Sequence, residues 1–272
     1  MQSILNRTDI FNNVDYVLVQ GDTTSCLGIA ISAFNNNKKI IHLEAGLRTF
    51  DFNNPFPEEG NRRLISHIAN IHFCPTENSR KNLLKEGIEK DVYVVGNTVL
   101  DNLKDLDINN NLKTRYDVII TMHRRENHQI IKDWFLKINS LKNKYRELSF
   151  CFIKHPNPSV LKHLNILSDI DILEPMSRID LLSLLSNSKY LITDSGGLQE
   201  ESSYFKIPAL VCRKVTERPE GLENFSLLCK DFKFLQDDFA KLTDMIPKGS
   251  SPYGNGETSS MISNILKENY LI

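Results

Sequence analysis

The sequence has little of what marks membrane-spanning, secreted or nucleic-acid-binding proteins. No run approaches the ~18 consecutive apolar residues of a membrane-spanning helix. The N-terminal residues MQSILNRTDIFNN lack the basic and apolar regions of a secretory signal. The 33 Lys and Arg nearly balance the 34 Asp and Glu, and the net charge is -1. This balance argues against a surface for DNA or an anionic membrane, but it is compatible with a local site for a phosphate.

Cysteines are few and scattered. There are five, an odd number, and no C-x-x-C pair, which argues against a disulfide framework and against a metal site. All but the first lie in or beside apolar runs, where cysteine behaves as a small hydrophobic residue. We therefore expect those four to be buried and reduced, and the protein to be cytoplasmic. The five are Cys26, Cys74, Cys151, Cys212 and Cys229.

Short apolar runs recur along the chain. They are rich in β-branched and aromatic residues without strict alternation, which is typical of strands buried on both faces of a sheet. The predicted strands are 16–20, 39–43, 71–74, 92–95, 118–121, 150–154, 171–174, 190–193 and 209–212. Predicted helices alternate with them, at 24–34, 59–70, 77–86, 133–142, 178–186 and 198–205. This alternation predicts an α/β fold with mostly parallel sheets.

One weakly apolar segment divides the chain. Residues 103–116, LKDLDINNNLKTRY, are rich in Asn and mixed charge, as in a linker between two lobes. The first lobe is predicted to span residues 1–105, joined by residues 257–272, which contain a last helix from Ser259 to Tyr270. The second lobe is predicted to span residues 114–249.

Acidic residues follow the strands of the first lobe. Ligands of open α/β sheets bind beyond the carboxyl ends of the strands, so residues at these positions are candidates for a site. Asp22 follows the first strand in Gly-Asp-Thr-Thr, where a plain helix cap is the alternative. Glu44 follows the second strand in EAGLRT. Glu58 and Glu59 open a helix in PFPEEGNRR, where compensation of the helix dipole is the alternative. The functional interpretation of this pair is a third acid near Asp22 and Glu44, and three such acids in one lobe suggest acid–base chemistry.

The second lobe has anion-binding features at the same strand ends. Residues 118–121 are followed by His123, Arg124 and Arg125, whose side chains can bind phosphates. A solvated charged loop is the alternative. Ser195, Gly196 and Gly197 follow residues 190–193 and begin a helix, whose N-terminal N–H groups can bind a phosphate; a plain turn is the alternative. Glu201, one to two turns into that helix, could reach the ribose of a nucleotide. Two arginines and a lysine, Arg213, Lys214 and Arg218, add positive charge beyond residues 209–212 unless they form a surface loop.

Taken together, these positions predict a cleft between two Rossmann-like lobes that binds a phosphorylated ligand. The phosphates would lie on the second lobe, and the acids of the first lobe would face the rest of the ligand. A Walker A loop is absent from the sequence, so a nucleoside triphosphate site of that type is not predicted.

Five motifs in this order resemble one family, the non-hydrolysing UDP-N-acetylglucosamine 2-epimerases. They are HLEAGLRT, PFPEEGNRR, MHRREN, TDSGGLQEE and TERPEG, and the resemblance extends from DYVLVQGDTT to PYGNGE. It implies a GT-B-like fold and the interconversion of UDP-N-acetylglucosamine and UDP-N-acetylmannosamine. The C2 proton is removed, UDP leaves to give a 2-acetamidoglucal, and UDP adds back after protonation of the opposite face. No cofactor is implied, and the implied partners are a UDP-sugar and a second copy in a homodimer.

The resemblance also assigns residues. The family's acids correspond to Asp22, Glu44 and Glu58, without a choice of which takes the C2 proton, and its active-site histidine corresponds to His123. Its UDP-phosphate loop corresponds to Ser195, Gly196 and Gly197, its ribose-binding carboxylate to Glu201, and a nucleotide-site arginine to Arg218.

One departure from the family concerns the N-terminus. Family members begin with a strand and a Gly-Thr-Arg-Pro-Glu loop, which this sequence lacks. We therefore expect a first lobe with missing strands, an uncovered sheet edge and an incomplete site. A truncated gene or misassigned start, a partner chain that supplies the missing piece, and a surviving remnant with a binding role are the three explanations.

Three further functions remain as alternatives. They are a UDP-sugar-binding remnant without turnover, an epimerase of another UDP-2-acetamido sugar, and a GT-B glycosyltransferase. The last ranks low because a transferase does not need the paired acids of EAGLR and PEE.

Overall fold

The computed structural model describes residues 9–104 and 116–270, and these residues form two compact units. Unit 1 is Met1–Asp101 with Tyr253–Ile272, and unit 2 is Asn102–Pro252. Most of the predicted linker, residues 105–115, lies outside the described residues. Each unit has its own parallel sheet and its own hydrophobic clusters. Among the described residues, no helix has the length and apolar character needed to cross a bilayer.

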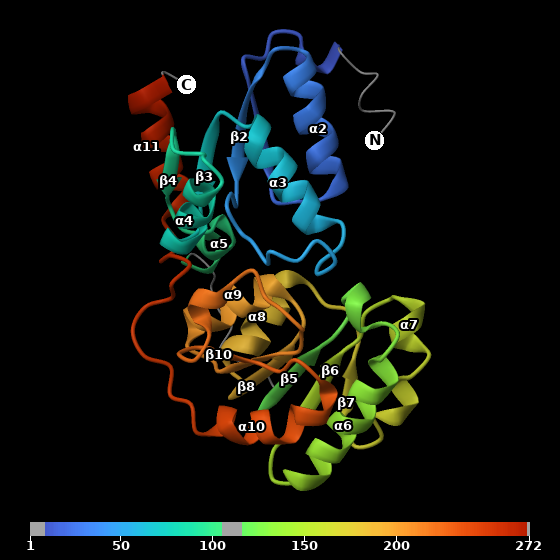
Figure 1. The fold of residues 1–272 in the computed structure, drawn as a ribbon. Coiled ribbons are helices and arrows are strands. Elements are labelled where there is room, and N and C mark those ends of the chain that lie inside the picture. Colours follow the sequence, from blue (N-terminus) through green and yellow to red (C-terminus); the bar gives the residue numbers. More distant parts are fainter. Residues whose placement is uncertain (1–8, 105–115, 271–272) are drawn as a thin grey trace. The chain divides into compact units, whose positions relative to one another are not determined.

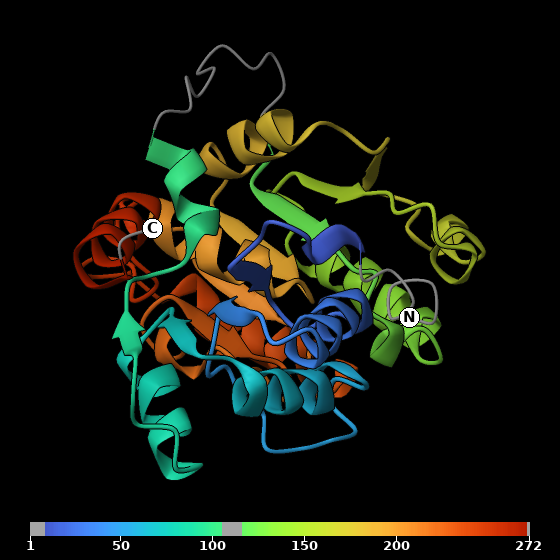
Figure 2. The same cartoon turned by 90° about the horizontal axis from the view of Figure 1, so that it is seen from above.

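Unit 1 is a four-stranded parallel sheet in the order β1-β2-β3-β4. Its strands are β1 (Tyr16–Gln20), β2 (Lys39–Leu43), β3 (Ile71–Cys74) and β4 (Val92–Val94). Its helices are α2 (Thr24–Asn35), α3 (Glu58–Ile68), α4 (Glu77–Lys85) and α11 (Thr258–Tyr270). The short helix α5 (Asp101–Lys104) begins at the last residue of this stretch of unit 1 and continues into unit 2. Figures 1 and 2 show α2 and α3 on one side of the sheet and α11 on the other.

Residue alternation explains these two layers. Ile40 packs into the cluster of α2 and α3, whereas its neighbour Ile41 packs into the cluster that includes Ile262 of α11. Successive side chains of a strand point to opposite faces, so a continuous apolar run fills both layers.

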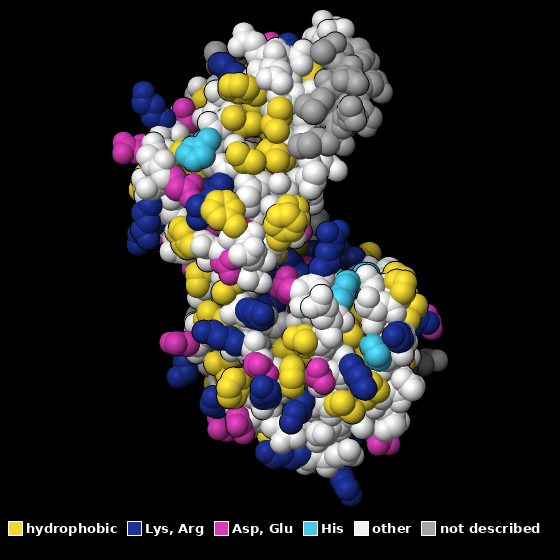
Figure 3. All heavy atoms as spheres, turned by 45° about the vertical axis from the view of Figure 1, so that its right-hand side comes forward, with side chains coloured by type: hydrophobic (Ala, Val, Ile, Leu, Met, Phe, Trp, Pro, Cys, Tyr) yellow, Lys and Arg dark blue, Asp and Glu magenta, His cyan; other side chains and the backbone are white. Residues whose placement is uncertain are grey.

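The described part of unit 1 has an open edge at β1. There β1 pairs with β2 only, and Leu18 of β1 is 52% exposed. Apolar side chains also reach the surface elsewhere on this unit, as Figure 3 shows; Phe34, at the end of α2, is one of the exposed residues.

Unit 2 is a six-stranded parallel sheet in the order β10-β9-β8-β5-β6-β7. Its strands are β5 (Val118–Thr121), β6 (Phe150–Ile153), β7 (Asp171–Leu173), β8 (Tyr190–Thr193), β9 (Ala209–Val211) and β10 (Ser226–Leu228), and its helices are α6 (Ile131–Lys144), α7 (Pro158–Leu161), α8 (Arg178–Ser186), α9 (Gly196–Phe205) and α10 (Leu235–Thr243). Side chains of α6 and α10 form one hydrophobic cluster with the sheet, and side chains of α8 and α9 form another.

The strand order of unit 2 reverses at its centre. From β5 the chain adds β6 and β7 on one side, then returns to place β8, β9 and β10 on the other. Strands β5 and β8 are therefore neighbours, with Thr121 in register with Thr193. A reversal of this kind leaves a crevice at the carboxyl ends of the two strands, which is where ligands of such sheets bind.

Candidate functional site

The loops that follow β5 and β8 are fastened together by one buried carboxylate. Asp194, which follows β8, is completely buried. Its oxygens accept hydrogen bonds from the backbone N–H of His123 at 3.0 and 3.1 Å and of Arg124 at 2.9 Å. The amide of Asn127 donates to the same carboxylate at 3.0 Å. The predicted histidine and the predicted anion loop thus lie side by side at the reversal point of unit 2.

The His123 ring is oriented by two neighbours. Its Nδ1 lies 3.7 Å from Oδ1 of Asp194, and its ring stacks on that of His155 with centroids 4.7 Å apart. Burial lowers the pKa of His123 against the opposing effect of Asp194, so the imidazole is neutral at pH 7. The sequence reasoning missed His155. Its position could have revealed it, because His155 directly follows the predicted strand 150–154. That strand pairs with β5 in the sheet.

The N-terminus of α9 has two glycines in different surroundings. Ser195 is the N-cap, and its hydroxyl accepts from the N–H of Leu198 at 3.5 Å. A Cβ on Gly196 would lie 2.5 Å from Nη1 of Arg218, whereas a Cβ on Gly197 would meet no atom within 4 Å. The first N–H groups of a helix have no partner within the helix. The space above Gly197 is therefore open to an anion.

The two arginines expected to add positive charge are neutralised by carboxylates instead. Arg218 is buried and ion-paired with Glu200 and Glu217, and Arg213 is buried and ion-paired with Glu126 and Glu217. A buried guanidinium needs such partners because the loss of its hydration is costly. Arg218 nevertheless lies against the N-terminus of α9, as its closeness to Gly196 shows.

Glu201 is buried in the second turn of α9. Its carboxylate accepts a hydrogen bond from the guanidinium of Arg178, which begins α8. Burial raises the pKa of Glu201 to about 7, although Arg178 acts in the opposite direction. Its protonation state therefore changes near neutral pH.

In unit 1, Asp22 is held by α3. The Arg62 guanidinium donates to Oδ2 of Asp22 from Nη2 and, at 3.1 Å, from Nε, and Asn61 donates to the backbone carbonyl of Asp22 at 2.8 Å. Arg62 also pairs with Glu59 at 3.3 Å. The helix cap expected of Gly-Asp-Thr-Thr is present, because Thr23 caps α2, and the Asp22 carboxylate is paired with Arg62 instead.

Glu44 lies beside Gly21 at the neighbouring strand end. Its backbone has φ of +59°, in the left-handed region, and its Oε1 accepts from Nδ2 of Asn97 at 2.8 Å. A Cβ on Gly21 would lie 3.3 Å from the other oxygen, Oε2. Burial raises the pKa of the Cys26 thiol to about 11, with further contributions from Asp22 and Glu44. Because Gly21 immediately precedes Asp22, the position of Oε2 brings Glu44 and Asp22 together at this edge of the unit 1 sheet.

The two glutamates of PFPEEG differ in environment. Glu59 is fully buried and accepts from the N–H groups of Thr49 at 3.0 Å and Phe50 at 3.2 Å, so it fixes the loop before α3. Glu58 is partly exposed, and its Oε2 is a buried atom without a hydrogen-bond partner among the described residues. Glu58 thus has the spare hydrogen-bonding capacity that Glu59 lacks.

Among the described residues, neither a disulfide nor a cluster of metal ligands is part of this arrangement. All five cysteines are free and buried, including Cys26, for which the sequence made no prediction. Within residues 9–104 and 116–270, no group of three or more His, Cys, Asp or Glu could hold a metal ion.

Comparison with known proteins places this geometry in a family. The model of the UDP-N-acetylglucosamine 2-epimerase family matches residues 4–267. The Campylobacter jejuni UDP-N-acetylglucosamine 2-epimerase is 36% identical over 98% of this chain and 77% of its own length, and the Neisseria meningitidis enzyme is 36% identical over 98% and 80%.

Solved structures agree. The structure of S. aureus MnaA with UDP has a TM-score of 0.92 at 34% identity over 99% of this chain and 80% of that one. The N. meningitidis UDP-GlcNAc 2-epimerase bound to UDP-GlcNAc has a TM-score of 0.91 at 35% identity over 98% and 81%. The fold is α/β and GT-B-like, as predicted, and this chain belongs to the UDP-N-acetylglucosamine 2-epimerase family.

Proposed function

We propose that this protein is a UDP-N-acetylglucosamine 2-epimerase, which interconverts UDP-N-acetylglucosamine and UDP-N-acetylmannosamine without a cofactor. The observation that carries the proposal is the joining of two loops at the reversal point of unit 2. There Asp194 holds His123 beside the open N-terminus of α9. The related N. meningitidis enzyme has been solved with UDP-GlcNAc bound, so a ligand of this class is the one to expect.

In this proposal unit 2 binds the UDP group. The phosphates accept hydrogen bonds from the N–H groups at the start of α9, around Ser195, Gly196 and Gly197. The neutral imidazole of His123 donates to the same phosphates or to the sugar. Glu201 accepts the ribose hydroxyls, and Arg218 completes the nucleotide site by fixing the start of α9.

The carboxylates of unit 1 carry the proton transfers. A carboxylate among Asp22, Glu44 and Glu58 removes the C2 proton, and the electron pair forms the C1–C2 double bond while the C1–O bond to UDP breaks. UDP leaves with that bonding pair. Protonation of C2 on the opposite face and return of UDP to C1 give the other epimer. No net oxidation occurs, and the positive end of α9 stabilises the charge on the departing diphosphate.

We also infer a cytoplasmic homodimer. The five free, buried thiols suit a reducing compartment, and the homodimer follows from the family resemblance. Size-exclusion chromatography with light scattering measures the mass in solution, and a monomer would contradict the dimer.

Product formation tests the proposed reaction. Incubation with UDP-N-acetylglucosamine should produce UDP-N-acetylmannosamine, which its anomeric proton identifies in a ¹H NMR spectrum. A Glu44→Gln variant should bind UDP in calorimetry yet form product much more slowly, because it removes one of the three carboxylates proposed for the proton transfers. Binding of UDP by the unaltered protein without turnover would instead identify a UDP-sugar-binding remnant, and transfer of the sugar to an added acceptor would identify a glycosyltransferase.

A further inference from the structure

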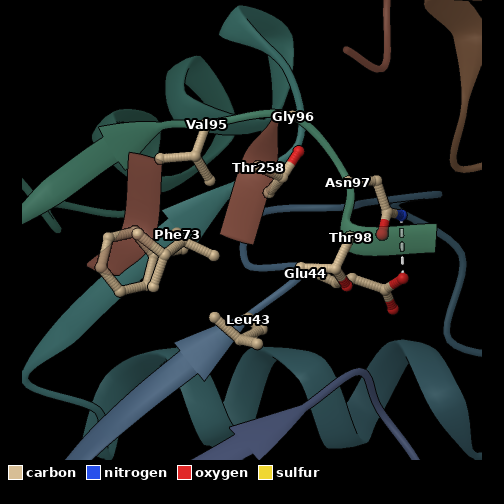
Figure 4. Close-up of a pocket in the computed structure, with 9 residues that line it drawn as sticks. Leu43, Glu44, Phe73, Val95, Gly96, Asn97, Thr98 and Thr258 are labelled. Carbon is tan, nitrogen blue, oxygen red and sulfur yellow. Dashed lines mark hydrogen bonds between the residues drawn. The ribbon is translucent and has the colours of Figure 1, made fainter. Parts of the chain in front are cut away.

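The side chain of Asn97 links Glu44 to the chain beyond β4. Its Nδ2 donates to Oε1 of Glu44 at 2.8 Å, as Figure 4 shows, and its Oδ1 accepts from the N–H of Val99 at 3.2 Å. Asn97 is 1% exposed. A buried amide with both ends engaged has one orientation available, so its donor points steadily at the carboxylate.

The backbone of Asn97 is fixed by the returning C-terminal segment. Its N–H donates to the carbonyl of Tyr253 at 2.7 Å. The preceding Gly96 has φ of +87°, and a Cβ there would lie 2.7 Å from Oγ1 of Thr258 and 3.0 Å from that carbonyl. Asp101 accepts from the N–H of Thr258 at 3.0 Å and of the next residue. The start of α11 and the turn around Asn97 thus hold each other in place.

Glu44 itself needs such support. Its φ of +59° is costly for a residue with a side chain. A glutamate side chain also has three rotatable bonds, which are ordered only where a partner restrains the carboxylate. The hydrogen bond from Asn97 restrains Oε1 of Glu44. The other oxygen, Oε2, lies on the side of Gly21, which is the residue before Asp22.

We propose that Asn97 is a positioning residue for Glu44 in the epimerase reaction. It holds one carboxylate oxygen so that the other faces the substrate in the orientation needed for proton transfer. This inference rests on the proposed function, because it assumes that Glu44 acts on the sugar.

Kinetics separate positioning from stability. Asn97→Ser keeps an oxygen for the N–H of Val99 but is too short to reach Glu44. Leu266→Ala is the matched control, because it weakens the packing of α11 on the sheet eight residues beyond Thr258, away from the turn that holds Asn97. We expect Asn97→Ser to lower kcat about 10- to 100-fold with KM within about twofold, the effect of losing a hydrogen bond to a charged group in the transition state. Leu266→Ala should keep kcat within about twofold at a similar loss of Tm.

A spectroscopic measurement tests the same contact without turnover. Labelling of glutamate with ¹³C at the carboxyl carbon, with assignment by Glu44→Gln, reports on the carboxylate directly. Its resonance should shift in Asn97→Ser and stay in place in Leu266→Ala. An unmoved resonance in Asn97→Ser, or an equal loss of kcat in Leu266→Ala, would overturn the inference. If the unaltered protein formed no product, the proposed function would fail, and the resonance would still decide whether Asn97 holds Glu44.

Discussion

Two glycines begin α9, and replacing each of them with alanine tests packing and ligand binding separately. Gly196 and Gly197 are adjacent in sequence, but a Cβ on the first would lie 2.5 Å from Nη1 and 2.8 Å from Cζ of Arg218, and a Cβ on the second would meet nothing within 4 Å. Alanine at Gly196 therefore tests the packing around Arg218. Alanine at Gly197 tests the open space above the helix, where the account places a phosphate.

The cost of Gly196→Ala follows from the surroundings of Arg218. Arg218 is 7% exposed, and its guanidinium pairs with Glu200 and Glu217, so it cannot make room without straining buried ion pairs. Removal of one partner of a buried pair costs about 3–5 kcal/mol, and a displaced guanidinium that keeps part of its contacts should cost about 2–4 kcal/mol. Gly197→Ala should change the free energy of unfolding by between zero and about 1 kcal/mol in the stabilising direction, because alanine favours the helix.

Two assays read these effects. Urea unfolding followed by the fluorescence of Trp134, the one tryptophan of the sequence and a core residue of unit 2, gives the stability of this unit. Calorimetry with UDP gives the affinity. Gly197→Ala should keep its stability but bind UDP at least about tenfold more weakly, since the methyl group blocks charged hydrogen bonds to the helix N–H groups. Unchanged UDP affinity in Gly197→Ala, or wild-type stability in Gly196→Ala, would refute this reasoning.

Three further predictions concern the framework of the site. Gly46→Ala should lower stability by about 2–4 kcal/mol in thermal unfolding, because φ is +81° and the Cβ would lie 2.1 Å from the backbone oxygen of Ser79; an unchanged Tm would contradict the close approach. Burial lowers the pKa of His42 to about 3 and that of His72 below its usual value, so both are neutral in the folded protein at pH 7. Unfolded imidazoles take up protons below their ordinary pKa of about 6.5, so stability should be complete above that pH and fall as the pH drops, by about 1.4 kcal/mol per unit for His42 and by a further amount for His72. A titration of Tm from pH 7.5 to 5 should be shallower in His72→Asn, and equal slopes would argue against a neutral His72. Asp194→Ala should lower the free energy of unfolding by about 3 kcal/mol, because two backbone N–H groups and one side-chain amide of the loop after β5 lose their acceptor. A denaturant midpoint equal to that of the unaltered protein would contradict this prediction.

Much of the fold could be predicted because the strands are continuous apolar runs and the helices begin with recognisable caps. The prediction of a helix at 178–186 agrees with α8, whose N-cap Ser177 accepts from the N–H of Asp180 at 3.2 Å. Strand β10 was missed because Ser226–Leu228 is too short to show a period. Helix α10 was also missed, although Leu235, Phe239 and Leu242 have the i, i+4, i+7 spacing of an amphipathic helix and bury one face of it.

The candidate site could be predicted only where its residues follow strands. Asp22 and Glu44 follow strands of the unit 1 sheet, and His123 follows a strand of the unit 2 sheet. Within each sheet, parallel strands bring such positions to one edge. Their partners could not be predicted in this way. Asn97 is 53 residues from Glu44, and Arg62 is 40 residues from Asp22. Such pairings depend on how a helix or loop packs against the sheet, which local sequence does not encode.

Incorporation of solvent deuterium at C2 tests the central claim most directly, because it reports removal of that proton. The full chain is incubated with UDP-N-acetylglucosamine in D₂O, and the nucleotide sugars are examined by NMR and mass spectrometry. The account predicts one deuterium at C2 in both the gluco and the manno sugars at equilibrium. UDP-sugar bound by the protein but recovered with its C2 proton intact would contradict it.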